Sequence, residues 1–294
     1  MNPDPREGMI AGGGDEVAIL AGGGAFPLAV ASAVEARGGR AFLIGIRGEA
    51  DPAIETHPHT WIALGQIGHL FAAARKRKLS RLVMIGSIVS RRLPRPWELD
   101  LVGLMHLWKN RDIMKSGDDT TLRRVAKLIE AGGFEVVAAA DVAPNLVMPA
   151  GPIGKIAPEG ADWRDIAAGF AAAKELGARD LGQGVIAVDG TVARREDRRG
   201  TDAMLADHEA AHGRGPRGGV LVKCLKPQQD RRLDMPALGT RTVDGAARAG
   251  LKGIAVEAGG TLVLNLDEVA RAADLAGLYV VGVNAAALMA ETPT

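Results

Sequence analysis

The sequence has little cysteine, no long apolar run and almost no net charge. Cys224 is the single cysteine, so an internal disulfide is excluded and a reducing compartment is favoured. No apolar run approaches the ~18 residues of a membrane-spanning helix, and the first fourteen residues contain none that is typical of a signal peptide or an anchor. The 36 basic and 35 acidic side chains nearly cancel, which argues against a nucleic-acid partner.

Apolar side chains are plentiful enough for more than one core. The 294 residues exceed what one core usually organises, and 47% of them are hydrophobic against 24% that are charged. We therefore expect two domains in a soluble, cytoplasmic protein.

Short apolar runs alternate with longer helical stretches from Glu16 onward, which is typical of α/β layers around a largely parallel sheet. A stretch rich in proline and glycine interrupts this pattern at residues 142–158, as an interdomain linker does. The predicted fold is α/β, with two α/β domains joined by this linker and a Rossmann-like N-terminal domain. The predicted parts are an N-terminal extension (1–15), the N-terminal domain (16–141), the linker (142–158), the C-terminal domain (159–287) and a tail (288–294).

The glycine turn after the first predicted strand resembles part of a dinucleotide-binding fingerprint. Gly22 and Gly24 allow backbone amides at a helix start to approach a phosphate. However, Pro27 occupies the third glycine position, and Arg47 stands where an acidic residue would hold a ribose. An NADP-dependent oxidoreductase is therefore one alternative, beside a loop for another anion or a simple tight turn.

The string His208-Glu209-Ala210-Ala211-His212 matches the zinc-protease pattern, in which two imidazoles four residues apart share one helical face. Glycine and proline at 213–216 break the helix at once, and no third histidine follows at metzincin spacing. A zinc metallopeptidase is the second alternative, against a solvated helix end.

Two segments of the second domain concentrate groups that phosphate chemistry needs. Thr201 and Asp202 stand at a predicted helix start, where a hydroxyl can cap the helix and the amides face an anion. Asp230 and Asp234 lie in the segment 226–236, and in an extended chain their spacing puts both carboxylates on one face, as a divalent metal requires. Helix capping and a surface strip of salt bridges are the alternatives.

Six ordered motifs resemble the LpxI-type UDP-2,3-diacylglucosamine pyrophosphatases. They are Ala21-Gly22-Gly23-Gly24-Ala25-Phe26-Pro27, residues 115–119 with 122–124, Gly182-Gln183-Gly184, residues 200–204, residues 226–231 with 234–236, and residues 247–251. One departure is Arg199, which stands where the family has an acidic residue, while Glu196 keeps an acidic side chain three residues earlier.

The resemblance implies metal-dependent hydrolysis of UDP-2,3-diacylglucosamine to UMP and 2,3-diacylglucosamine 1-phosphate in lipid A biosynthesis. It implies Mg²⁺ or Mn²⁺, a homodimer, and a C-terminal catalytic domain, and it allows a peripheral contact with the inner membrane. The residues expected to be catalytic are Asp230, Asp202 and Glu196, and the expected metal ligands are Asp230, Asp202 and Asp234. The expected substrate-binding residues are Gly23, Gly24, Phe26, Pro27, Lys115, Asp118, Asp119, Gly182, Gln183, Gly184, Thr201, Lys226, Gln229 and Arg231.

Overall fold

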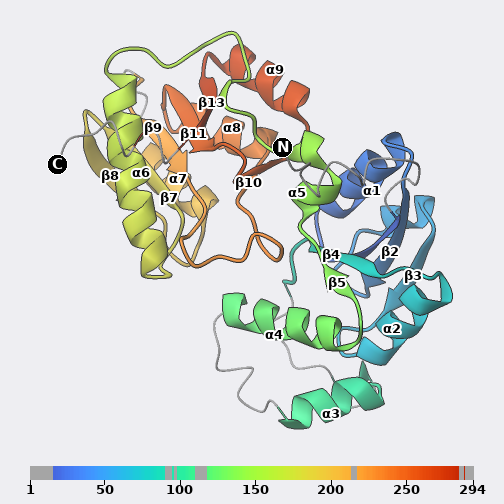
Figure 1. The fold of residues 1–294 in the computed structure, drawn as a ribbon. Helices are drawn as coiled ribbons and strands as arrows, with labels where there is room; N and C mark the ends of the chain where they lie inside the picture. Colours follow the sequence, from blue (N-terminus) through green and yellow to red (C-terminus); the bar gives the residue numbers. More distant parts are fainter. Residues whose placement is uncertain are drawn as a thin grey trace, which may run out of the picture. The chain divides into compact units, whose positions relative to one another are not determined.

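Two compact units make up the chain, Met1–Asn145 and Leu146–Thr294, and each is built around its own sheet (Figure 1). The structure, a computed structural model, describes residues 16–89, 95, 98–109, 118–212, 217–284 and 288. The predicted extension lies outside the described residues, as does the predicted tail apart from residue 288. Both units mix helices with strands, so the α/β prediction is confirmed.

The first unit has a parallel five-stranded sheet in the order β3-β2-β1-β4-β5. This is the Rossmann strand order, in which the chain reverses direction across the sheet between β1 and β4. The strands are β1 (Glu16–Ala21), β2 (Arg40–Ile46), β3 (His59–Ile62), β4 (Arg81–Ile85) and β5 (Glu135–Val136). The helices are α1 (Phe26–Ala36), α2 (Ile67–Lys76), α3 (Leu101–Lys109), α4 (Asp118–Ala131) and α5 (Ala139–Val142), with a 3₁₀ turn η1 (Pro52–Thr56).

The loops after β1 and β4 meet at the point where the strand order reverses. The Gly22 N–H donates to the Ile85 carbonyl at 2.9 Å, and the Gly23 N–H donates to the Ser87 carbonyl at 2.7 Å. The Ser87 N–H returns a bond to the Gly23 carbonyl at 3.0 Å. Both glycine amides are therefore used within the protein, which removes them from the phosphate-binding role that a dinucleotide fingerprint would give them.

We expect Gly22→Ala to lower the free energy of unfolding by about 1 to 3 kcal/mol, because a Cβ at Gly22 would lie 2.6 Å from the Ser87 carbonyl oxygen. Urea denaturation of the full chain measures this loss. Gly23→Ala is the matched control, since its Cβ would meet the Glu49 carbonyl and the Ser87 hydroxyl at 3.0 Å each. A loss for Gly22→Ala no larger than that for Gly23→Ala would contradict the steric explanation.

The second unit has a six-stranded sheet in the order β6-β13-β11-β9-β7-β8. Three of its inner strands, β13, β11 and β9, are parallel to one another, and the other pairs are antiparallel. The strands are β6 (Gly151–Pro152), β7 (Gly184–Val188), β8 (Thr191–Arg195), β9 (Val220–Lys223), β11 (Gly253–Glu257) and β13 (Tyr279–Val283), and β10 (Ala237–Leu238) pairs with β12 (Leu262–Val263) separately. Edge strand β6 lies in the stretch rich in proline and glycine that was predicted as the linker (142–158). Pro152 is tolerated in this strand because the strand is at the edge of the sheet.

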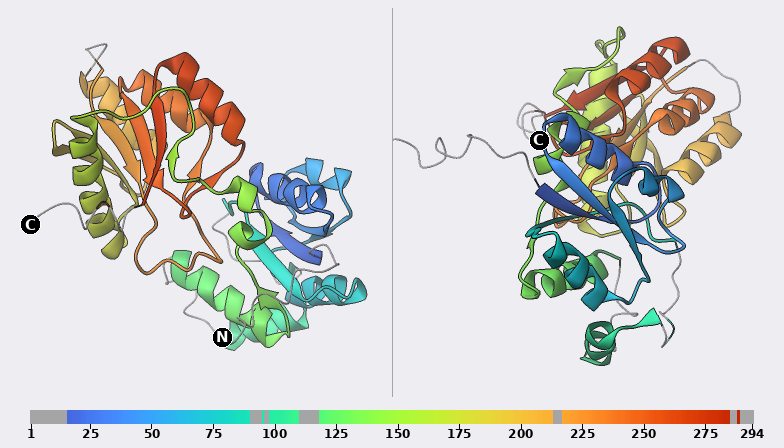
Figure 2. Two further views of the ribbon diagram at one scale, coloured as in Figure 1. Left: turned by 45° about the horizontal axis from the view of Figure 1, so that its top comes forward. Right: turned by 90° about the vertical axis from the view of Figure 1, so that its right-hand side faces the viewer.

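Helices cover both faces of this second sheet (Figure 2). Helix α6 (Asp162–Ala178) packs on one face, where Phe170 is fully buried against Val185 and Val222. On the other face lie α7 (Thr201–His212), α8 (Thr240–Arg248) and α9 (Leu266–Ala276). The sheet is thus the middle of three layers, and its polar groups collect at the strand ends.

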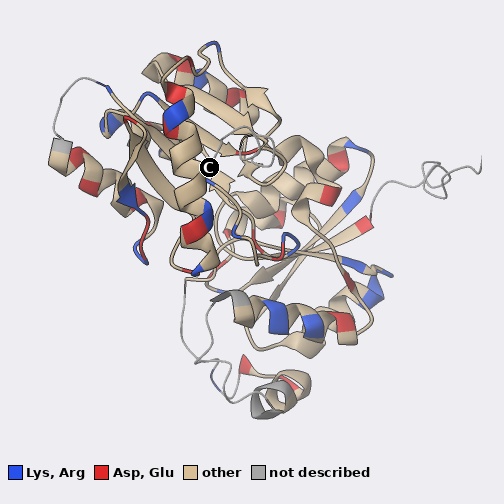
Figure 3. Cartoon of the chain, turned by 60° about the vertical axis from the view of Figure 1, so that its left-hand side comes forward, with Lys and Arg blue, Asp and Glu red and all other residues tan. Residues whose placement is uncertain are grey.

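Basic and acidic side chains are interspersed along the helices of both units (Figure 3). This mixture agrees with the near-zero net charge of the sequence. The few buried polar side chains are therefore more informative than the surface. Among the described residues they are Asp165, Glu196, His208, Lys223, Gln229 and Thr261.

Candidate active site

Three of the buried polar side chains lie at one edge of the second sheet, the edge that is formed by strand ends and not by an outer strand. They are Glu196, Lys223 and Gln229. Strand pairing explains this, because Gly184 at the start of β7 is opposite Lys223 at the end of β9. The end of β8 lies at the same edge, since Arg195 pairs with Val185. Loops that leave these strands therefore meet at the carboxyl end of β9, where parallel strands commonly bind ligands.

Glu196 joins three segments at this edge and is only 9% exposed. Its Oε2 accepts the Gln183 N–H at 2.8 Å, and its Oε1 accepts the Thr201 hydroxyl at 2.7 Å. Helical hydrogen bonding in α7 begins at the Gly200 carbonyl, which accepts the Met204 N–H, so the Thr201 hydroxyl serves Glu196 rather than the helix end. The structure thus brings together the predicted residues Gly182, Gln183, Gly184, Glu196 and Thr201.

The segment 226–236 is a loop folded into turns, so the spacing argument for an extended chain does not apply to it. The Leu233 and Asp234 N–H groups both donate to the Asp230 carbonyl, at 2.9 and 3.2 Å. The Asp230 Oδ1 accepts the Arg232 N–H at 3.0 Å, a side-chain turn that aspartate forms readily, and its Oδ2 pairs with Arg232 Nη2 at 2.7 Å. Asp234 instead accepts the side-chain amide of Gln229. Asp230 thus bonds to Arg232 and Asp234 to Gln229, both within this loop.

Other side chains of this segment hold it against the rest of the unit. The Gln229 Oε1 accepts the Lys226 N–H at 3.2 Å, and the Lys226 Nζ lies 2.7 Å from the Asp180 Oδ1. Arg231 donates to the Gly259 carbonyl. Three predicted substrate-binding side chains are therefore in one short loop, each with a protein partner.

Asp202 lies in the first turn of α7 and forms an ion pair with Arg241 of α8, with Asp202 Oδ2 and Arg241 Nη2 2.6 Å apart. Both side chains are more than half exposed. The pair therefore contributes little to stability, and its carboxylate is accessible from solvent.

Lys223 was missed by the sequence interpretation. It is 7% exposed, and its Nζ donates to the Ala237 carbonyl at 3.2 Å. Burial lowers the pKa of its ammonium group, although the nearby carboxylates of Glu196, Asp202 and Asp234 oppose that effect. The signal in the sequence was a lysine that ends the otherwise apolar strand Val220-Leu221-Val222.

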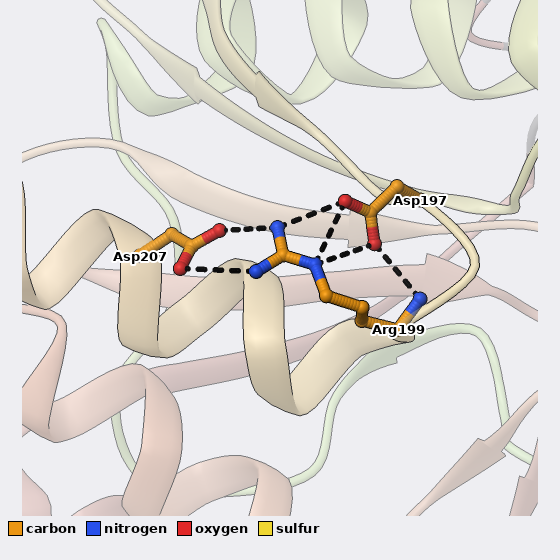
Figure 4. Close-up of polar contacts among 3 residues, drawn as sticks. All are labelled: Asp197, Arg199 and Asp207. Atoms are coloured by element: carbon orange, nitrogen blue, oxygen red, sulfur yellow. Dashed lines mark hydrogen bonds and ion pairs between the residues drawn. The ribbon is translucent and has the colours of Figure 1, made fainter.

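Arg199 connects the loop before α7 to the helix itself (Figure 4). Its Nη2 lies 2.8 Å from Asp197 Oδ2 and 2.6 Å from Asp207 Oδ2. Hydrogen bonds from Arg199 hold the pKa of the Asp197 carboxyl below its usual value. The basic residue at this position, where the family motif has an acidic one, thus has two local carboxylate partners.

We expect Arg199→Gln to raise the pKa of Asp197 toward the ordinary carboxyl range, because the guanidinium bonds are lost. A ¹³C NMR titration of the Asp197 carboxyl measures the change, and Arg241→Gln is the control because Arg241 pairs with Asp202 instead. Since the pKa is lowered in the folded protein, the pair stabilises the fold at neutral pH, and this stabilisation disappears as the pH falls below about 3.9. An Asp197 pKa that is the same in parent and Arg199→Gln protein would contradict this account.

The side chains of the zinc-protease string have different surroundings. His208 is buried on the face of α7 that packs on the sheet, and Glu209 pairs with Arg248, with Oε2 and Nε 3.7 Å apart. The His212 side chain lies outside the described residues. Among the residues that the structure does describe, no group of three or more His, Cys, Asp or Glu side chains is arranged to hold a metal ion.

Cys224, next to Lys223, is a buried free thiol. Burial raises its pKa to about 12, so the thiol stays protonated at neutral pH. Cys224 therefore packs as a small apolar side chain of the core.

The remaining predicted residues belong to the first unit. Gly23 lies in the loop after β1, Gly24 is exposed with a φ of 89°, and Phe26 and Pro27 form the first turn of α1. Asp118 and Asp119 begin α4, but their side chains lie outside the described residues, as does all of Lys115.

Taken together, the fold and the strand-end cluster define a two-unit α/β protein, with a Rossmann-type first sheet and a polar site on the second. The chain belongs to the LpxI family. The model of the LpxI N-terminal domain matches residues 16–146, and that of the LpxI C-terminal domain matches residues 149–281. The resemblance found in the sequence is therefore confirmed.

A relative and a solved structure were also found. The "UDP-2,3-diacylglucosamine pyrophosphatase LpxI" of Caulobacter vibrioides is 39% identical over 278 residues, which are 92% of this chain and 98% of that protein. The structure of glycinamide-RNase-transformylase T from Mycobacterium tuberculosis aligns with 62% of this chain and 44% of its own, at 15% identity and a TM-score of 0.23. A likeness that low carries no argument about this protein.

Proposed function

We propose that this protein hydrolyses the pyrophosphate of UDP-2,3-diacylglucosamine, releasing UMP and 2,3-diacylglucosamine 1-phosphate in lipid A biosynthesis. The supporting observation is its similarity to the Caulobacter vibrioides pyrophosphatase over 98% of that protein's length. The oxidoreductase alternative loses support because the Gly22 and Gly23 amides donate to protein carbonyls. The metallopeptidase alternative loses support because His208 is buried.

The reaction must bring water to a phosphorus atom that already has negatively charged oxygens around it. Asp230, half-buried in the turned loop, is the group that we assign to orienting the water and accepting its proton. Lys226 and Arg231 of the same loop would exchange their present protein partners for phosphate oxygens. Thr201 and the turn Gly182-Gln183-Gly184 would shape the pocket beside them.

The donors at this edge fit a hard divalent cation in chemical kind, since Asp230, Asp202 and Asp234 offer carboxylate oxygens. Mg²⁺ usually takes one or two protein carboxylates and completes its shell with water and substrate phosphate, so it does not need a preformed cage. These three carboxylates would hold it after giving up their bonds to Arg232, Arg241 and Gln229. Bound Mg²⁺ or Mn²⁺ would neutralise charge on the phosphate oxygens.

The substrate also bears on where the protein acts. Two acyl chains keep such a lipid in a bilayer, so we propose a cytoplasmic protein that makes peripheral contact with the inner membrane. The homodimer that we also propose is supported by the family resemblance alone. Helix α3 of the first unit supports the membrane contact, because Leu101 is 83% exposed and Leu104 and Met105 are more than half exposed. No helix among the described residues is long and apolar enough to cross a membrane.

The proposal is tested by incubating the purified full chain with UDP-2,3-diacylglucosamine and either Mg²⁺ or Mn²⁺. We expect many turnovers per protein molecule, followed by ³¹P NMR as release of UMP and loss of the pyrophosphate signals. If no UMP is released with either metal, NADPH binding would favour the oxidoreductase, and a chelator-sensitive peptidase activity would favour the metallopeptidase. Tight binding of substrate that stays intact would indicate a sensor instead.

A further inference from the structure

Lys223 lies under the proposed active site without belonging to any of the motifs that pointed to it. Its neighbour Leu221 packs with α7, α8 and α9, whereas Val222 packs with α6. Because side chains alternate along a strand, Lys223 lies on the α7 side, at the strand end where α7 begins. The chain thus brings a buried ammonium group to the face that holds Glu196 and Asp202.

The strand pairing brings Lys223 and Glu196 to the same end of the sheet. Lys223 is directly opposite Gly184, and the absence of a side chain there leaves room, since a Cβ on Gly184 would lie 3.2 Å from Glu196 Oε2. Three carboxylates, those of Glu196, Asp202 and Asp234, act on the Lys223 charge. They come from the loop after β8, from α7 and from the loop after β9, so one cation is shared by three segments.

The bond from Lys223 Nζ to the Ala237 carbonyl also has a consequence for the loop between them. Lys223 ends β9, and Ala237 begins β10, so this bond closes the base of the segment 224–236. That segment holds Asp230 and Asp234. The segment is also anchored at its start, where the Leu225 N–H donates to Glu257 Oε2 at 3.0 Å, and further along by Lys226 with Asp180, Gln228 with the Gly177 carbonyl and Arg231 with the Gly259 carbonyl.

We propose that Lys223 is a positioning residue for the hydrolysis, holding the Asp230 loop at its base and placing one buried positive charge at the strand end from which the segments with Glu196, Asp202 and Asp234 extend. This inference rests on the proposed function. Lys223 itself touches no substrate, since its Nζ is enclosed by the protein and bonded to Ala237.

The test is Lys223→Met, which keeps the length of the side chain and removes its charge. We expect kcat to fall at least ~100-fold while KM changes less than about threefold, because the catalytic groups are displaced and the substrate contacts remain. Lys223→Arg should recover at least about tenfold of the loss, since it restores a buried cation. Amide hydrogen exchange of residues 226–236 should quicken in Lys223→Met, as the loop has lost its basal bond.

Lys252→Met is the matched control, because Lys252 pairs with Asp162, with Nζ and Oδ1 3.6 Å apart, at the opposite edge of the same sheet. It should leave kcat unchanged. A kcat for Lys223→Met within threefold of the parent would overturn the inference, and so would a loss confined to KM. If Lys223→Met does not fold, Lys223→Gln takes its place, because it also removes the charge and keeps a polar end that can donate to the Ala237 carbonyl. A kcat for Lys223→Gln within threefold of the parent would again overturn the inference, whereas a parent protein without UMP release would overturn the proposed function instead.

Discussion

Asp230→Ala is expected to lower kcat by at least ~10³, which is about 4 kcal/mol of transition-state stabilisation. The carboxylate is half-buried, is fixed by its bonds to Arg232, and lies in the loop that also contains Lys226 and Arg231. Its loss should act on the chemical step more than on binding, because the uridine and the acyl chains keep their contacts. The variant should therefore bind UDP-2,3-diacylglucosamine and retain it intact, which a filter-binding assay followed by mass spectrometry measures.

Two matched variants separate this role from a structural one. Arg232→Ala removes the partner of Asp230 and leaves the carboxylate, so its effect on kcat should be much smaller. Asp267→Ala removes an acidic side chain from the first turn of α9 and should leave turnover unchanged. If Asp230→Ala turns over within tenfold of the parent, Asp230 is a surface carboxylate, and Asp202 with Glu196 takes its assignment.

The inner strands of both sheets were predictable from the sequence because each is a short apolar run with a sharp end. The run 253–257 is an example: it forms β11, in which all residues but the last are buried and no polar side chain interrupts the apolar run. Strand β3 was not predicted. His59 and Thr60 give it no apolar period, and it forms because the edge of β2 offers hydrogen-bond partners. Local composition does not show which segments will pair in a sheet.

The candidate site shows the same division. Motif order identified the loop 226–236 and the segments around Gly182-Gln183-Gly184 and Thr201, because these residue types suit phosphate chemistry. Residue spacing failed for Asp230 and Asp234, since the periodicity of an extended chain does not hold in turns. Lys223 was missed because its role follows from its position opposite Gly184 and from carboxylates of other segments, and the local sequence shows neither.

Glu196→Ala is expected to lower both stability and turnover. The Glu196 carboxylate is buried and accepts the Gln183 N–H and the Thr201 hydroxyl, while it also compensates the buried charge of Lys223. Removing the carboxylate leaves the Gln183 N–H and the Thr201 hydroxyl without their acceptor, which typically costs about 1 to 3 kcal/mol for each buried group. We therefore expect a loss of that size in urea denaturation, and a fall in kcat of at least ~10²-fold as the segments around Gln183 and Thr201 separate.

Glu196→Gln distinguishes the charge from the hydrogen bonds. The glutamine carbonyl still accepts the Gln183 N–H, and its shape is retained, but the negative charge opposite Lys223 is gone. Its loss of stability should be smaller than that of Glu196→Ala, and the double variant Glu196→Gln with Lys223→Met should be more stable than Glu196→Gln alone, because the uncompensated cation has been removed. A double variant whose stability loss equals the sum of the two single losses would mean that Glu196 and Lys223 do not interact, and Glu196 would then act only through the bonds to Gln183 and Thr201.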